Sequence, residues 1–143
     1  MSIYFDTSAF AKRYVAEIGS DAVDAFLMDQ SADDCIISPL VVTELNSILQ
    51  RLQRTGLMDA EFAARARVAL AVDLTSALWA MRPFATGSFD RAGCLLRELP
   101  TPLATLDALH LACAIELQCT SMATADRQLA AAAIAVGLNV HHF

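Results

Sequence analysis

The fold is decided near the N-terminus by residues 3–10, IYFDTSAF. Three apolar residues lead directly into Asp6, and from Thr7 onward the apolar spacing becomes that of a helix. We therefore expect a short buried strand, residues 2–5, followed at once by a helix. Asp6 stands at the junction, where an aspartate can cap the helix or act as the first ligand of a metal site.

The same alternation continues along the chain. Apolar runs predict strands at residues 35–38, 121–124 and 139–141, whereas LWAMRPF, residues 78–84, is ambiguous between a strand and an irregular segment. Helical spacing predicts helices at residues 20–29, 39–54, 59–73, 89–99, 105–117 and 127–136, with Ser20 and Ser38 as N-caps. This order predicts an α/β three-layer sandwich with a central parallel sheet of about five short strands, flanked by helices. We find no repeat or linker and expect a single domain, residues 1–143.

Composition and charge narrow the functional classes. The chain has 16 acidic and 10 basic residues, a net charge of −6, so contact with nucleic acid requires local arginines rather than a broad basic surface. The four cysteines lack zinc-ligand spacing and are expected to be reduced thiols. No signal peptide is recognisable, and the longest uncharged apolar run, residues 129–138, is too short to span a bilayer. We expect a cytoplasmic protein that does not contact membranes.

Four acidic residues are expected at one edge of this sheet. Asp6 and Asp126 follow strands, Asp107 lies in the first turn of a helix, and Glu44 lies two turns into the helix after residues 35–38. Ligands of such sheets bind beyond the carboxyl ends of the strands. Each aspartate taken singly is more often a helix cap. Glu44 lies among apolar residues and is expected to be partly buried, where a carboxylate needs a proton, a cation or several donors.

Converging carboxylates raise one another's pKa, and a hard divalent cation removes that penalty by coordinating their oxygens. Oxygen ligands without cysteine or a histidine pair favour Mg²⁺ or Mn²⁺ over zinc. Such a site suits phosphodiester hydrolysis, because the metal lowers the pKa of a bound water and shields the charge on the phosphoryl oxygens. We expect Asp6 and Asp107 to be direct ligands, Glu44 to complete the site, and Asp126 to act through water or a second metal.

Four stretches resemble the acidic motifs of the PIN-domain ribonucleases, and specifically of the VapC-type toxins of bacterial toxin–antitoxin pairs. They are YFDTSAFAKRY, SPLVVTELNSIL, TLDALHLACA and MATADRQLAAAA, in this order over almost the whole chain. The resemblance implies a Mg²⁺- or Mn²⁺-dependent RNA endonuclease on a five-stranded parallel sheet, inhibited by a cognate VapB-like antitoxin that covers the groove. It also implies roles as metal-binding acids for Asp6, Glu44, Asp107 and Asp126, with Ser8 and Thr124 as polar neighbours.

Other residues are candidates for supporting roles at the site. Five arginines are candidates for contact with RNA phosphates: Arg13, Arg51, Arg54, Arg91 and Arg127. Arg127 is best placed because it adjoins Asp126, and Arg13 is the candidate from the first helix, although each is more often a solvated helix charge. His110 lies one turn after Asp107, and a lone histidine in an apolar helix is more often a core residue than a catalytic one. The chain is 56% hydrophobic, which favours a homodimer formed through apolar helices.

Two other classes of protein fit the sequence less well than a metal-dependent nuclease. A phosphoacceptor receiver domain needs a lysine near the last strands, but the lysine here is Lys12 in the first helix. A haloacid-dehalogenase-like phosphatase needs a second acid two residues after Asp6, where Ser8 stands. The alternative that stays open is a non-catalytic module that binds RNA or a protein through the same acidic groove.

Overall fold

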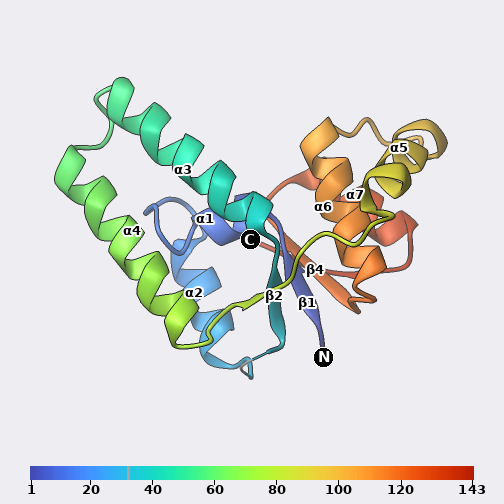
Figure 1. Ribbon diagram of the computed structural model, residues 1–143, viewed down its shortest axis with the longest axis horizontal. Coiled ribbons are helices and arrows are strands. Elements are labelled where there is room, and N and C mark those ends of the chain that lie inside the picture. The colour runs from blue at the N-terminus through green and yellow to red at the C-terminus, as the bar shows by residue number, and fades with distance from the viewer. Residues whose placement is uncertain (32) are drawn as a thin grey trace.

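A computed structural model describes residues 1–31 and 33–143 (Figure 1). Within these residues, five strands form one parallel sheet in the order β3-β2-β1-β4-β5. The strands are β1 (Ile3–Phe5), β2 (Cys35–Ile37), β3 (Ala80–Met81), β4 (Ser121–Thr124) and β5 (Asn139–His142). The first strand is therefore the central one, and its neighbours come from opposite halves of the sequence.

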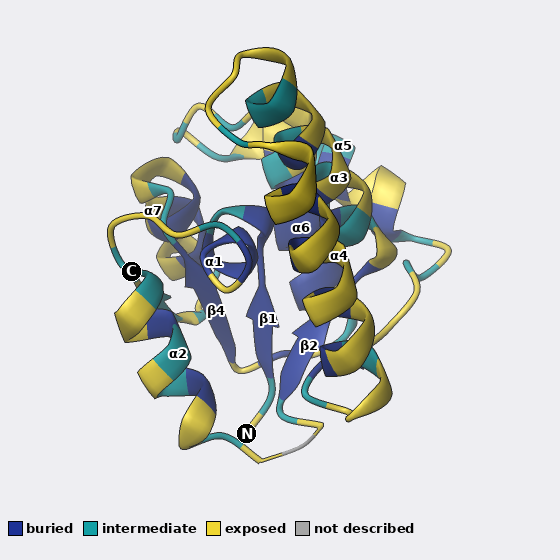
Figure 2. Cartoon of the chain, turned by 90° about the vertical axis from the view of Figure 1, so that its left-hand side faces the viewer, coloured by how far each residue is buried: buried dark blue, intermediate teal, exposed yellow. Residues whose placement is uncertain are grey.

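Helices cover both faces of the sheet, as the predicted three-layer α/β sandwich requires (Figures 1 and 2). They are α1 (Thr7–Ala11), α2 (Ser20–Met28), α3 (Pro39–Arg54), α4 (Ala60–Thr75), α5 (Ser88–Glu98), α6 (Thr105–Glu116) and α7 (Arg127–Ala135). One apolar core lies between the sheet and helices α1 to α4, and a second lies between the sheet and helices α5 to α7. The predicted helices are confirmed, with ends that differ by a residue or two.

Strand β1 divides its side chains between the two cores. Successive side chains of a strand point to opposite faces, so Ile3 and Phe5 enter the first core while Tyr4 enters the second. All three residues are buried, as expected for the central strand of a parallel sheet covered on both faces. Tyr4 consequently carries a hydroxyl into the layer between the sheet and α6.

Of the two predicted caps, the position of Ser38 is confirmed and that of Ser20 is wrong. Ser20 is the first residue of α2, and Gly19 is the N-cap, with a φ of 93° in the left-handed region that glycine adopts without strain. Ser38 does occupy the N-cap position of α3, but its side chain makes no capping bond. The Ser38 hydroxyl instead lies 2.8 Å from the Tyr4 hydroxyl. The ambiguous segment LWAMRPF contributes the two-residue edge strand β3.

Other expectations concerned the cysteines and the membrane. Cys35, Cys113 and Cys119 are buried, Cys94 is half-buried, and all four are free thiols, as predicted. In the part of the chain that the structure describes, the helices fall short of the length and apolar character that a membrane span requires.

Candidate acidic active site

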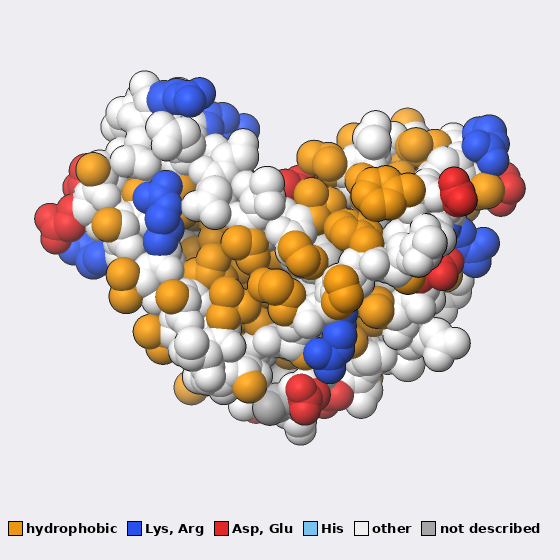
Figure 3. Space-filling view, in the orientation of Figure 1, with side chains coloured by type: hydrophobic (Ala, Val, Ile, Leu, Met, Phe, Trp, Pro, Cys, Tyr) orange, Lys and Arg blue, Asp and Glu red, His pale blue; other side chains and the backbone are white. Residues whose placement is uncertain are grey.

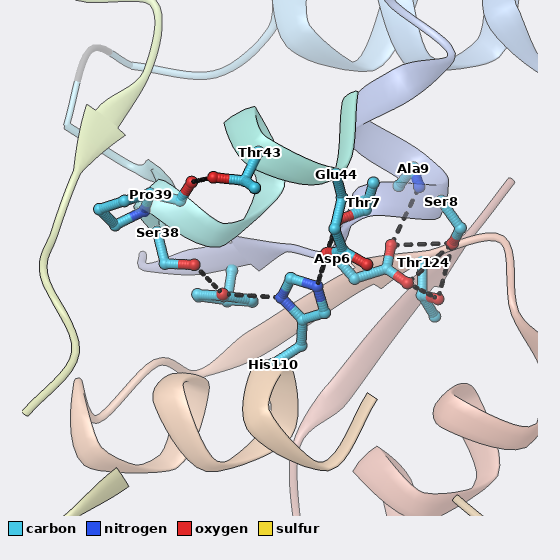
Figure 4. Close-up of polar contacts among 11 residues, drawn as sticks. Asp6, Thr7, Ser8, Ala9, Ser38, Pro39, Thr43, Glu44, His110 and Thr124 are labelled. Carbon is cyan, nitrogen blue, oxygen red and sulfur yellow. Dashed lines mark hydrogen bonds and ion pairs between the residues drawn. The ribbon is translucent and has the colours of Figure 1, made fainter. Parts of the chain in front are cut away.

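Asp6 leaves the end of β1 at the carboxyl edge of the sheet and caps α1. Its backbone N–H donates to the Ala123 carbonyl at 3.1 Å, which aligns it with the end of β4. Its carboxylate accepts from the Ala9 N–H at 2.9 Å, from the Thr124 hydroxyl at 2.8 Å, and from the Ser8 hydroxyl, which lies 2.8 and 2.9 Å from its two oxygens (Figure 4). Thr124 and Ser8 are thus placed beside Asp6, as the sequence predicts.

The environment of Asp6 disfavours its charge. The residue is only 3% exposed, and burial raises the pKa of its carboxyl even though the N–H of Ala9 and the hydroxyls of Ser8 and Thr124 all favour the ionised form. Three donors therefore do not repay the loss of water around this carboxylate. A cation close to Asp6 would stabilise the ionised form of its carboxyl.

Asp126 is connected to Asp6 through Thr124. The Asp126 backbone N–H donates to the Thr124 hydroxyl oxygen at 3.0 Å, and that hydroxyl donates to Asp6. Asp126 itself caps α7, where its Oδ1 accepts from the N–H groups of Gln128 at 2.7 Å and Leu129 at 2.8 Å. Both strand-end aspartates are therefore helix caps and members of one polar cluster, so the two roles do not exclude each other.

Glu44 approaches the cluster from α3 and is half-buried, as predicted, with 22% of its side chain exposed. Its Oε2 lies 2.6 Å from Nε2 of His110 and also accepts from the Thr7 hydroxyl. Burial raises the pKa of Glu44, but the hydrogen bonds from His110 and Thr7, together with the charge interaction with His110, outweigh it and leave the pKa below its usual range. Glu44 is thereby held ionised.

Asp107 lies in the first turn of α6, as predicted, and is half-buried. Burial raises its pKa, and the negative charge of Asp126 raises it further, followed by a smaller contribution from Glu44. The N–H of Ala104 and the charge interaction with His110 act in the opposite direction. Asp107 is therefore electrostatically connected to two other acids, which supports the predicted convergence of α3, α6 and β4 on one site.

The four acids supply the type of ligand that a hard divalent cation prefers. In residues 1–31 and 33–143, no three His, Cys, Asp or Glu side chains are already arranged to hold a metal ion, so binding requires the carboxylates to turn toward one another. The acids nonetheless offer only oxygen, and Asp6 and Asp107 both carry a raised pKa that a bound cation would relieve. Oxygen ligands of this kind suit Mg²⁺ or Mn²⁺.

Two hollows border the acids. One, of about 190 Å³, is lined by Thr7, Glu44, Ser47, Ile48, Arg51 and Leu106. The other, of about 320 Å³, includes Ser8, Lys12 and Ala125 and shares Ile48 and Arg51 with the first. Arg51 is exposed and lines both hollows, so a cationic side chain borders the hollow that contains Glu44.

The candidate arginines fall in different places. Arg13 turns away from the acids, because its Nε lies 3.1 Å from Asp73 and its guanidinium also pairs with Asp24 at 2.9 Å. Arg127 is exposed beside Asp126, as its sequence position requires. Arg51 thus lines the hollow that contains Glu44, Arg127 is an exposed residue next to Asp126 in the sequence, and Arg13 is engaged in ion pairs with α2 and α4.

Sequence reasoning missed three contributors to the site: Thr7, Tyr4 and Ser38. Tyr4 OH lies 3.0 Å from Nδ1 of His110 and connects that ring to Ser38. The sequence offered one signal, which was that Tyr4 places a hydroxyl in an otherwise apolar strand. His110 is 2% exposed, so its predicted burial is confirmed, but it also contacts Glu44.

Fold and site together define an α/β domain that collects four carboxylates at the carboxyl edge of a parallel sheet. The family model for the PIN domain matches residues 3–135, which is almost the whole chain. The chain therefore belongs to the PIN domain family, and the resemblance drawn from the four acidic motifs is confirmed at that level.

Solved structures share this fold. VapC20 of Mycobacterium tuberculosis, described as a toxin that cleaves the sarcin-ricin loop, superposes with a TM-score of 0.69 at 18% identity, covering 92% of this chain and 95% of its own. FitAcB of Neisseria gonorrhoeae superposes with a TM-score of 0.73 at 19% identity, covering 98% of this chain and 96% of its own. PAE2754 of Pyrobaculum aerophilum superposes with a TM-score of 0.70 at 20% identity, covering 98% of this chain and 83% of its own. No curated protein sequence matches the chain. The PIN-like fold prediction is confirmed.

Proposed function

We propose that the chain is a Mg²⁺- or Mn²⁺-dependent endoribonuclease of VapC type, a single PIN domain over residues 1–143. The observation that carries the proposal is the gathering of the four acids at one edge of the sheet: Thr124 connects Asp126 to Asp6, and His110, one turn after Asp107 on α6, contacts Glu44. Acids held this close at a cost in charge are typical of a cation site. Membership of the PIN family supports the same activity.

The protein's own residues have separable tasks in this reaction. A bound divalent cation supplies an activated water and positive charge opposite the phosphoryl oxygens. Asp6 is fixed by Ala9, Ser8 and Thr124 and presents a rigid carboxylate. The His110 and Thr7 bonds of Glu44 are to Oε2, which leaves Oε1 to face the cation or orient the attacking water. The capping bonds of Asp126 are to Oδ1, which leaves Oδ2 available to a cation or its bound water.

RNA is the substrate that the surroundings of the acids favour. Arg51 lines both hollows, one of which contains Glu44, and Arg127 is exposed and follows Asp126 in the sequence. Arginines bind phosphate through a planar pair of donors. A strand laid across the acids would therefore find one cationic contact on α3 and another at the start of α7. Arg13, with two carboxylate partners, is the weaker candidate for RNA contact.

A toxin role accompanies the nuclease. We expect inhibition by a cognate VapB-like antitoxin and a cytoplasmic setting, in line with the fold shared with the toxin VapC20.

We also expect that the protein forms a homodimer. Apolar side chains gather over the hollowed face shown in Figure 3. On α5 and α6, Phe89, Leu96 and Leu106 are 64%, 42% and 44% exposed. Apolar surface of this kind favours a protein partner.

A non-catalytic module that binds RNA or protein is the second candidate. It is favoured by one observation: among the described residues, no three ligand side chains stand ready around a cation position. Such a module would tolerate the replacement of an acid by its amide. A metal-dependent nuclease would not.

The two functions are separated by RNA cleavage with purified protein in EDTA, Mg²⁺ or Mn²⁺. The test variant is Asp6→Asn, and Asp59→Asn is the matched control, because Asp59 also caps a helix through its side chain but does so at the start of α4. We expect metal-dependent cuts that Asp6→Asn reduces by at least about 100-fold, equivalent to about 2.7 kcal/mol of transition-state stabilisation. Asp59→Asn should cut like wild type. Equal RNA binding with no cleavage by any form would favour the non-catalytic module.

A further inference from the structure

A buried chain of hydrogen bonds runs from the sheet to Glu44. The Ser38 hydroxyl lies 2.8 Å from Tyr4 OH, Tyr4 OH lies 3.0 Å from Nδ1 of His110, and Nε2 of His110 lies 2.6 Å from Oε2 of Glu44 (Figure 4). Ser38 and Tyr4 are fully buried, and His110 is 2% exposed. Only the last member, Glu44, reaches solvent.

The hydrogens in this chain can be assigned from the acceptor at its end. An ionised carboxylate only accepts, so Nε2 of His110 must carry the hydrogen that it shares with Glu44. In the neutral ring, Nδ1 then accepts from Tyr4 OH, whose oxygen accepts from Ser38. In this arrangement each ring nitrogen and each buried hydroxyl has a partner, and Nε2 donates to Glu44.

This arrangement fixes two acids relative to each other. His110 and Asp107 lie one turn apart on α6, while Glu44 lies on α3. The contact between His110 and Glu44 therefore connects the helix of one acid to the side chain of another, and Tyr4 locks the ring from the sheet side. Without the bond from Nε2, only the Thr7 hydroxyl still holds Glu44, and its long side chain gains rotamers that point away from Asp107.

We propose that His110 is a positioning residue whose Nε2–H holds Glu44 in place for divalent cation binding by the acidic site. The proposal rests on the proposed metal-dependent function and extends it to a residue that itself is too buried to touch RNA. A purely structural histidine would affect folding stability alone. A positioning histidine also sets the affinity for the cation.

Two amide variants distinguish the roles of the two ring nitrogens of His110. In His110→Gln the side-chain amide nitrogen reaches the position of Nε2 and can still donate to Glu44. In His110→Asn the amide reaches only the position of Nδ1, next to Tyr4. We expect Mn²⁺ affinity, measured without RNA by electron paramagnetic resonance, to fall by about 10- to 100-fold in His110→Asn and by no more than about threefold in His110→Gln.

RNA cleavage gives an independent readout. Because the inferred defect is in cation binding, His110→Asn should lose activity at low Mn²⁺ and recover most of its kcat at saturating Mn²⁺. Thermal unfolding in EDTA controls for folding, since both amides remove the same buried ring. Variants that lose stability but bind Mn²⁺ like wild type would overturn the positioning role.

A measurement on the wild-type protein needs no variant. Two-bond ¹H–¹⁵N correlation spectra distinguish the ring nitrogens of His110, and the proposal requires a hydrogen on Nε2 in the metal-free protein. An Nε2 without hydrogen would overturn it. If wild type cleaves RNA with Mn²⁺ and only the His110 tests fail, the proposed function stands without this inference. If wild type neither binds Mn²⁺ nor cleaves RNA, both are overturned.

Discussion

Replacing Asp73 with alanine should lower the free energy of unfolding by about 3 kcal/mol. Asp73 lies on α4 and is 7% exposed. Its carboxylate accepts from Tyr14 OH at 2.9 Å and from Nε of Arg13 at 3.1 Å, and Tyr14 in turn accepts from the Trp79 indole at 2.7 Å. One carboxylate thus joins the end of α1, α4 and the segment before β3.

The magnitude follows from the groups left behind. The buried Tyr14 hydroxyl would lose its acceptor, at about 1–3 kcal/mol, and burial raises its pKa, so it stays a donor without a partner. Arg13 would lose a charge-assisted bond, but its side chain is 34% exposed and Asp24 remains as a partner, so we count only about 1 kcal/mol. Alanine returns up to about 0.7 kcal/mol of helix propensity.

Asp24→Ala is the matched control for this variant. Asp24 also lies within a helix and pairs with the same guanidinium at 2.9 Å, but its side chain is 45% exposed. A surface pair of this kind is worth about 0–1 kcal/mol. Urea denaturation gives both free energies, and scanning calorimetry should show a Tm drop of about 6–12 °C for Asp73→Ala against less than about 4 °C for Asp24→Ala.

Equal losses of stability in the two variants would refute the reasoning, because they would mean that burial of the carboxylate adds nothing to the pair. The comparison also decides how Arg13 is used. If Asp73→Ala is unstable and yet cuts RNA like wild type per folded molecule, the Arg13 ion pairs serve the fold. Stronger RNA binding by Asp73→Ala would instead return Arg13 to the candidates for phosphate contact.

Three further outcomes are expected. Burial raises the pKa of Asp6, so in EDTA its contribution to stability is present at low pH and lost as pH rises through the folded-state pKa. Asp6→Asn should therefore unfold at a higher temperature than wild type by a margin that grows with pH, and parallel curves would contradict this. Asp126→Asn removes a like charge and should lower the pKa of Asp107 in carboxyl NMR titrations of metal-free protein; an unchanged titration would mean that the two acids do not interact. Arg51→Ala should weaken RNA binding and reduce its salt slope by about 0.7, whereas Arg54→Ala, on the same helix outside both hollows, should not.

Local signals were sufficient for much of the site. Asp6 and Asp126 were predicted at strand-to-helix junctions because a short apolar run, an acidic residue and a helical period follow one another in the sequence, and both are caps in the structure. Glu44 was expected to be partly buried because apolar residues surround it on its helix, and it is. These features depend on neighbours within about two turns, which a single sequence contains.

Partners from distant segments could not be predicted in this way. The bond from Tyr4 to His110 joins residues 106 positions apart, and the bond from Arg13 to Asp73 joins residues 60 positions apart. Nothing local to Ser38 indicated that its hydroxyl would turn from the helix end to Tyr4. Which of several polar groups a side chain selects is decided by tertiary packing, and pattern reasoning has no access to it.

The sheet order also has a consequence for synthesis of the chain. Asp6 is made well before its neighbours Thr124 and Ala123, which belong to β4 and come 118 and 117 positions later, as their contacts with Asp6 show. On the ribosome, β1 can pair with β2 early, whereas its other edge stays open until β4 has emerged. The acids therefore come together only after β4 has been made. A nascent or truncated chain that lacks β4 cannot assemble the site.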